Sequence, residues 1–148
     1  MAEPEAQLPV DPVDLVDLRE DCLSYTPTVR SIPLARRRAA RLVSEWGRPA
    51  LAGDAALVLS ELMTNALLHG SLRDRLIRVR ITLTATTLRI EVSDPRGERL
   101  PSPRPADGEE QFGRGLLLVG ALADDWGVEP RGGVGKTVWA VLKGGRPC

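Results

Sequence analysis

The segment from Glu61 to His69 constrains this chain more than any other, because it places a carboxylate, an amide and an imidazole four residues apart. Glu61, Asn65 and His69 stand at positions i, i+4 and i+8, so on a helix they share one face. The apolar residues around them also recur at helical spacing: Ala55, Val58, Leu59, Leu62, Met63, Ala66 and Leu67. The pattern predicts a helix over roughly 50–68, with one buried side and a polar row that faces a cavity.

This polar row suits metal and phosphate chemistry. The Glu61 carboxylate can accept a proton or orient a hydroxyl group. The amide oxygen of Asn65 is a hard ligand that magnesium accepts beside phosphate oxygens and water. A solvated helix face without such a function is the alternative, and the row alone does not exclude it.

Two downstream segments favour the phosphate-binding interpretation. Residues 88–94 alternate apolar and polar side chains and end in Asp94, which predicts a strand that is followed by a turn. Gly113 and Gly115 then precede an apolar helical pattern. Unpaired amides at a helix start attract phosphate, and glycine lets an oxyanion come close.

In the order and spacing of these segments the chain resembles the Bergerat-type ATP-binding fold of gyrase, histidine kinases and heat-shock chaperones. Within that group it is most similar to the anti-sigma-factor serine/threonine kinases of bacterial partner-switching systems. The resemblance spans roughly residues 24–142. It rests on the N-box residues Glu61, Asn65, His69 and Gly70, on Asp94, on the glycine box Gly113–Gly115, and on the hairpin at Gly135–Trp139.

The resemblance implies an α+β fold, a two-layer α/β sandwich in which a mixed sheet carries its helices on one face. The order of local patterns predicts the same layers. We expect a first strand over 22–32, a helix that Pro33 opens and that runs through Trp46, the N-box helix, a hairpin of strands over 77–83 and 88–92, a helix over 116–123 and two last strands near 126–128 and 136–142. The stretch 96–111 is rich in proline, glycine and charge, which predicts a long loop that acts as a lid.

ATP and Mg²⁺ are the cofactors that the resemblance implies. It assigns Glu61 as the catalytic residue for a substrate hydroxyl, and Asn65 as the metal ligand. Asp94 would read the adenine amino group, with Thr137 helping through a bridging water. The other cofactor-binding residues implied are Gly97, Gly113, Arg114, Gly115 and Leu116.

The first glycine box departs from the family pattern of Asp-x-Gly-x-Gly. Asp94 is followed by Pro95, Arg96 and a single glycine, Gly97, displaced by one position. Glycines there would let the backbone approach a nucleotide closely. Two main functions stay open: a homodimeric kinase that phosphorylates an antagonist protein and sequesters a sigma factor, or a nucleotide-responsive binding module without phosphotransfer. A structural interaction domain that has lost ATP is a third.

The zero net charge hides an asymmetry. Residues 1–21 carry seven acidic side chains against Arg19 alone, together with three prolines, which predicts an acidic flexible leader before a single domain at 22–148. The main basic cluster, Arg36–Arg38 with Arg41, lies on an amphipathic helical pattern without interleaved aromatic residues. This composition favours a solvated face or an acidic protein partner over nucleic acid.

Several other classes of protein are disfavoured. No continuous apolar run approaches the roughly 18 residues of a membrane span, and no signal pattern opens the chain, so we expect a cytoplasmic protein. Gly132–Thr137 resembles a phosphate-binding P-loop, but Pro130 stands where that motif needs glycine and a strand-like run follows. His69 is the only histidine, so a separate phospho-accepting histidine, as in a histidine kinase, is absent from the sequence.

Overall fold

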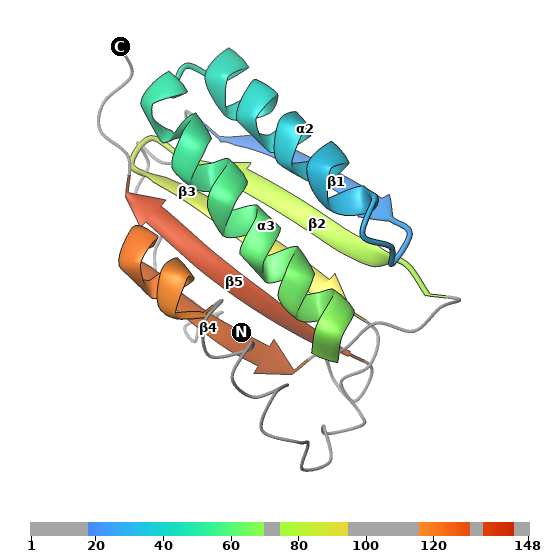
Figure 1. The fold of residues 1–148 in the computed structure, drawn as a ribbon. Helices are drawn as coiled ribbons and strands as arrows, with labels where there is room; N and C mark the ends of the chain where they lie inside the picture. The colour runs from blue at the N-terminus through green and yellow to red at the C-terminus, as the bar shows by residue number, and fades with distance from the viewer. Residues whose placement is uncertain (1–17, 70–74, 95–115, 131–134, 144–148) are drawn as a thin grey trace, which may run out of the picture.

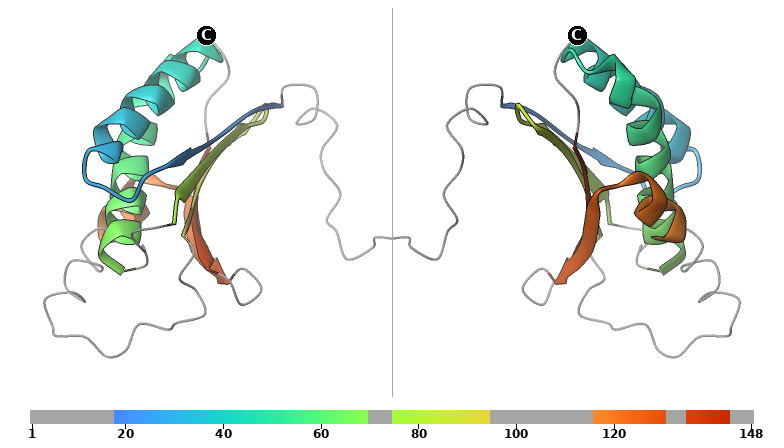
Figure 2. Two further views of the ribbon diagram at one scale, coloured as in Figure 1. Left: turned by 90° about the vertical axis from the view of Figure 1, so that its right-hand side faces the viewer. Right: turned by 90° about the vertical axis from the view of Figure 1, so that its left-hand side faces the viewer.

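The computed structural model describes residues 18–69, 75–94, 116–130 and 135–143. Two layers make up this part of the chain, with the helices on one face of a curved sheet (Figures 1 and 2). Residues 116–122 are helical as well. The remaining elements are β1 (Arg19–Tyr25), α2 (Ser31–Glu45), the short 3₁₀ helix η1 (Pro49–Leu51), α3 (Ala52–His69), β2 (Ile77–Leu83), β3 (Thr87–Asp94), β4 (Asp125–Pro130) and β5 (Lys136–Lys143).

The sheet has five strands in the order β1-β2-β3-β5-β4. This arrangement confirms the predicted α+β two-layer sandwich, but all four described pairings are antiparallel, whereas the sequence predicted a mixed sheet. The physical reason lies in the connection between β1 and β2. When one helix connects two strands, the chain reverses direction twice and the strands run parallel. Here two helices, α2 and α3, lie between β1 and β2, so the chain reverses once more and β2 runs antiparallel to β1.

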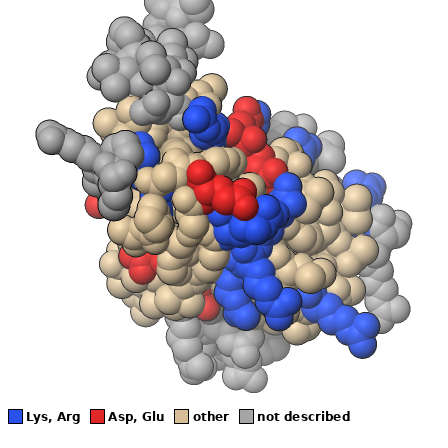
Figure 3. Space-filling view, turned by 90° about the horizontal axis from the view of Figure 1, so that it is seen from above, with Lys and Arg blue, Asp and Glu red and all other residues tan. Residues whose placement is uncertain are grey.

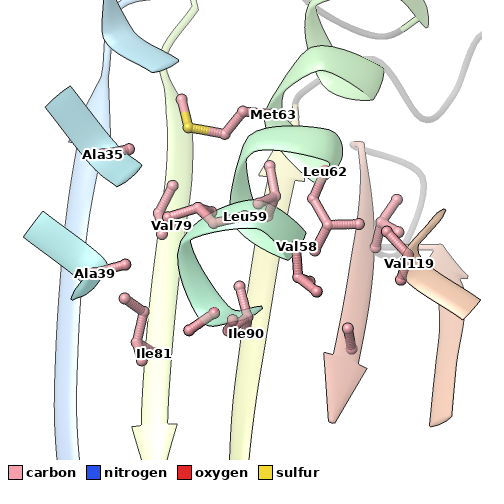
Figure 4. Packing of buried hydrophobic residues seen from close by; sticks show 14 of the residues in the cluster. Ala35, Ala39, Val58, Leu59, Leu62, Met63, Val79, Ile81, Ile90 and Val119 are labelled. Atoms are coloured by element: carbon pink, nitrogen blue, oxygen red, sulfur yellow. The ribbon is translucent and has the colours of Figure 1, made fainter. Parts of the chain in front are cut away.

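The hydrophobic core fills the space between the two layers. On β2 the side chains alternate between buried and exposed, as expected for a strand that is covered on one face. Leu59, Leu62 and Met63 of α3 are fully buried; Leu59 lies beside Val79 of β2, whereas Leu62 points toward Val119 (Figure 4). The apolar face that the sequence predicted for α3 therefore packs against the apolar face that it predicted for the hairpin.

Helix α3 is long and apolar enough to cross a membrane by length and composition alone, because Pro49–Leu68 has a mean hydropathy of 1.3. Half of that window is nevertheless buried inside the domain. Its apolar face packs on the sheet, which is the usual position of a core helix in a two-layer fold. The hydropathy of α3 is thus accounted for by its place in the core.

The start of the fold differs from the predicted boundaries. The predicted boundary between leader and domain after Asp21 lies inside β1, which begins at Arg19 and ends at Tyr25 instead of residue 32. Helix α2 begins at Ser31, so Pro33 is its third residue. Proline is tolerated there because the first helical N–H groups have no partner within the helix. The predicted lid over 96–111 lies outside the described residues.

Asp21 ties β1 to helix α2. Its two carboxylate oxygens accept hydrogen bonds from Nη2 and Nε of Arg38, at 2.7 and 3.0 Å. Fork-shaped pairs of this kind are stronger than single contacts. An acidic residue that the sequence assigned to the leader therefore holds the edge strand against the helical layer.

We predict that Gly127→Ala destabilises the protein by about 1–3 kcal/mol, as overpacking does in well-packed sites. Gly127 of β4 pairs with Trp139 of β5, and an added Cβ would lie 2.7 Å from Cζ2 of the indole ring. The Arg89 guanidinium stacks on the indole ring, at 4.6 Å from the ring centroid, and restricts movement of the ring away from the added atom. Urea unfolding followed by tryptophan fluorescence measures the loss.

Gly53→Ala is the matched control for this substitution. Gly53 lies in the first turn of α3, and nothing is within 4 Å of an added Cβ. Alanine is the better helix former by about 1 kcal/mol, so the control should be neutral or stabilising. Equal effects of the two substitutions would show that the contact between Gly127 and Trp139 has no special role.

Candidate functional site

Helix α3 positions the polar row that the sequence predicted. Its neighbouring side chains Leu62, Met63 and Ala66 are at most 2% exposed, which fixes the rotation of the helix against the sheet. Glu61 is half-buried and Asn65 is only 5% exposed. His69 is the last residue of α3, and its side chain and Gly70 lie outside the described residues.

Asn65 is the unusual member of this row. Both side-chain atoms, Oδ1 and Nδ2, are buried, and neither has a hydrogen-bond partner among the described residues. An unsatisfied buried polar group costs about 1–3 kcal/mol, so native proteins contain few of them. An amide that is kept buried and unpaired is therefore poised for a ligand that the protein itself does not provide.

The other polar side chains on α3 do not share this property. The Ser60 hydroxyl donates to the carbonyl oxygen of Ala56 at 3.0 Å, and the Thr64 hydroxyl donates to the carbonyl oxygen of Ser60 at 2.8 Å. Both bonds stay within the helix. Glu61 forms no ion pair or hydrogen bond in the described part of the chain, so its carboxylate is available for chemistry.

Asp94 comes to the same end of the molecule. It is the last residue of β3 and is 1% exposed. In Figure 1 the end of β3, the start of β5 and the last turns of α3 lie together at one end of the sandwich. The fold therefore brings Asp94 and the α3 row, which are separated by about thirty residues in the sequence, to one edge of the domain.

Thr137 lies near the start of β5, the last strand. It pairs with Ser93, and the two hydroxyl oxygens are 2.7 Å apart, while Lys136 is the residue opposite Asp94. Successive strand residues point to opposite faces, so Thr137 and Asp94 do not share a face. The role of Thr137 beside Asp94, through a bridging water, stays a prediction.

Lys136 is a charged residue at this edge to which the sequence assigned no role. It is partly buried, and its side chain forms no ion pair or hydrogen bond among the described residues. A signal was present in the sequence, because Val138, Ala140 and Leu142 of β5 are the apolar, buried positions. Their period of two assigns Lys136, and not Thr137, to the face of the sheet that the helices cover.

The remaining predicted residues are only partly described. Gly97, Gly113, Arg114 and Gly115 lie outside the described residues. Leu116 begins the described part of the helical segment 116–122, and its side chain is 8% exposed within the core cluster. Its side chain therefore packs against the core, and its predicted contact with a ligand stays a prediction.

Magnesium fits this site only together with a ligand. Among the described residues, no group of three or more His, Cys, Asp or Glu side chains could hold a metal ion. Magnesium commonly takes one or two protein oxygens plus phosphate oxygens and water. The amide oxygen of Asn65 would be one such protein oxygen, and phosphate oxygens and water would complete the coordination of the ion.

A pocket of about 510 Å³ lies apart from this polar row. Its described lining residues are Leu116, Leu117, Gly120 and Trp126, so it is apolar and lies between the segment 116–122 and β4. None of these side chains carries a titratable group. The described lining of the pocket therefore offers no side chain for acid–base catalysis.

Comparison with known proteins agrees with the geometry. A family model described as a histidine kinase-like ATPase domain matches residues 25–142. The match begins at the end of β1, ends in β5, and contains Glu61, Asn65 and Asp94. No curated protein matches the chain. The family match supports the predicted ATP-binding domain as a whole and does not single out the anti-sigma-factor kinases.

Proposed function

Because the chain belongs to the histidine kinase-like ATPase domain family, and is therefore an ATP-binding domain, we propose that it is a protein serine/threonine kinase. Its substrate would be a hydroxyl group of an antagonist protein, and it would sequester a sigma factor in competition with that antagonist. The observation that carries the proposal is the buried, unpaired amide of Asn65 one helical turn after Glu61. We further propose that the protein is cytoplasmic and acts as a homodimer.

Each site residue has one task in this mechanism. The Asn65 amide oxygen would hold Mg²⁺, which when bound neutralises phosphate charge. Asp94 would accept a hydrogen bond from the adenine amino group. Glu61 would orient the hydroxyl of the substrate and accept its proton. Positioning and charge neutralisation supply most of the rate in phosphoryl transfer, so the catalytic machinery can be this small.

The acceptor residue belongs to another protein in this proposal. The chain has a single histidine, His69, at the end of the core helix α3. A histidine kinase carries its acceptor histidine on a separate dimerisation helix. A core helix at the nucleotide site does not have that role, and this favours transfer to a hydroxyl group of a partner.

A second candidate is a nucleotide-responsive binding module without phosphotransfer. The sequence after Asp94 favours it, because Pro95 and Arg96 precede the single glycine Gly97 of this box. The available carboxylate of Glu61 favours the kinase, since a binding module has no use for a base beside the metal ligand. The two candidates share ATP binding and differ only in phosphotransfer.

ATP binding is tested first. We expect MgATP at about a hundred times its dissociation constant to stabilise the fold by roughly 2.7 kcal/mol. For a domain of this size the Tm should rise by roughly 5–10 °C in a thermal unfolding scan. ATP with excess EDTA is the control and should give a much smaller shift. An unchanged Tm at millimolar MgATP would exclude both candidate functions.

A further inference from the structure

Helix α2 carries a row of basic side chains on its solvent face. Arg30, Leu34, Arg37 and Arg41 stand at positions i, i+4, i+7 and i+11, so they lie along one side of the helix, and all four are exposed. We call the three arginines, together with Leu34 between them, the basic row. Figure 3 shows Lys and Arg side chains gathered in a band on the upper face of the molecule.

Nearby acidic side chains neutralise only part of the positive charge of the basic row. Arg41 forms an exposed ion pair with Glu45 at 3.3 Å. Arg30 and Arg37 form no ion pair among the described residues. Val29 is 75% exposed and Leu34 is 55% exposed, so apolar side chains accompany the unpaired charges. A complementary ligand would combine carboxylates with apolar residues.

The first seventeen residues of the chain have that composition. They contain Glu3, Glu5, Asp11, Asp14 and Asp17, and no Lys or Arg. Apolar residues precede the three aspartates: Val10, Val13 and Val16. This segment, which we call the acidic leader, thus repeats an apolar and an acidic residue every three positions.

The acidic leader also joins the fold close to α2. It leads into β1, and the ion pair of Asp21 with Arg38, at 2.7 Å, holds β1 against that helix. Seventeen extended residues reach roughly 55 Å. Helix α2 has 15 residues and is therefore about 22 Å long. Every position of the basic row is within reach.

The spacing of charges matches as well. In an extended polyproline II conformation, residues three apart lie on one side and about 9.3 Å from each other, which would align Asp11, Asp14 and Asp17. Arg30 and Arg37 are seven residues apart on a helix, or about 10.5 Å. Pro9 and Pro12 favour this extended conformation in the leader.

We propose that the acidic leader docks on the basic row of α2 within the same molecule. The aspartates pair with Arg30 and Arg37, and the intervening valines contact Leu34 and Val29. Tethering gives the leader a high effective concentration, so a weak contact is sufficient. Any acidic partner protein that uses this face must first displace the leader.

The test uses the full chain with a nitroxide label. Cys22→Ser and Cys148→Ser remove the native thiols, and Ala6→Cys carries the label in the leader. At about 0.05 M salt we expect strong relaxation broadening of NMR signals from residues 30–41 of α2. At about 1 M salt the broadening should disappear, because the Debye length falls to about 3 Å.

Charge reversal supplies the decisive comparison. Arg30→Glu with Arg37→Glu should abolish the broadening, whereas Arg75→Glu with Arg78→Glu should leave it unchanged. Arg75 and Arg78 are also exposed and free of ion pairs in the described chain, so the pairs are matched in charge. Arg30 precedes the first turn of α2, where an acidic residue is favourable, and Arg37→Glu places a carboxylate four residues before Arg41, so α2 should remain folded, as circular dichroism will show.

Reversal of the leader charges completes the cycle. Asp11→Lys with Asp14→Lys should restore the broadening in the Arg30→Glu, Arg37→Glu protein. Broadening that survives reversal of the basic row, or that is absent from the wild-type chain at low salt, contradicts the proposal. Broadening that grows with protein concentration would assign the basic row to a second copy of the chain and would also overturn it.

Discussion

Asn65→Leu should strongly weaken magnesium-dependent ATP binding without destabilising the fold. The wild-type amide is buried, and neither Oδ1 nor Nδ2 is paired with a described residue, so the folded protein carries its desolvation cost. A leucine of similar size removes that cost, and the free energy of unfolding should stay equal or rise by up to about 2 kcal/mol. Loss of the magnesium ligand should weaken MgATP binding by about 100-fold, or about 2.8 kcal/mol.

Two measurements on the same protein are needed. Isothermal titration with MgATP gives the affinity, and urea unfolding gives the stability. Ser60→Ala is the matched control, because Ser60 is buried on the same helix but its hydroxyl is satisfied by the carbonyl oxygen of Ala56. It should bind MgATP normally. An Asn65→Leu protein that keeps its affinity but unfolds more easily would show that the amide is structural.

Glu61→Gln should remove phosphotransfer and leave ATP binding intact. Glutamine keeps the size of the side chain and one acceptor oxygen, but it cannot accept a proton. A positioned general base contributes about 10²–10⁴-fold to rate, so phosphorylation of the antagonist should fall by that factor. The measurement is transfer of labelled phosphate from ATP to the antagonist protein, with the affinity for MgATP determined in parallel.

Glu91→Gln is the control for this second substitution. Glu91 is also a partly buried glutamate, but it lies on β3 and accepts a hydrogen bond from Nε of Arg89 at 2.7 Å. Its removal should leave phosphotransfer unchanged. Full activity in the Glu61→Gln protein would mean that another group acts as the base. Absence of transfer in the wild-type protein, together with tight MgATP binding, would favour the binding module.

Local patterns in the sequence were sufficient for the elements that carry the site. The apolar period of Val58, Leu59 and Leu62 predicted helix α3, and it predicted that Glu61 and Asn65 share a face. The alternation in β2 and β3 predicted the hairpin and the position of Asp94 at a strand end. Such inferences succeed because bond geometry alone sets the periods of helix and strand, whatever lies elsewhere in the chain.

Pairing between distant segments could not be derived in this way. The register of β3 with β5 placed Lys136 opposite Asp94 and Thr137 opposite Ser93, and a slip of one residue exchanges the two faces. Likewise, the pairing of β1 with β2 brought the end of the predicted leader into the sheet. Register and edge pairing depend on how separate elements fit around a common core.

The isolation of the Asn65 amide was likewise decided only by the tertiary structure. The sequence determined that Asn65 follows Glu61 by one helical turn, and this was enough to predict which side chains belong together. Whether the amide would find a partner depended on every neighbour that the fold brought near it, and none of the described residues pairs with it. A sequence determines local periodicity, whereas burial and hydrogen bonding of a single side chain arise from the packing of all layers at once.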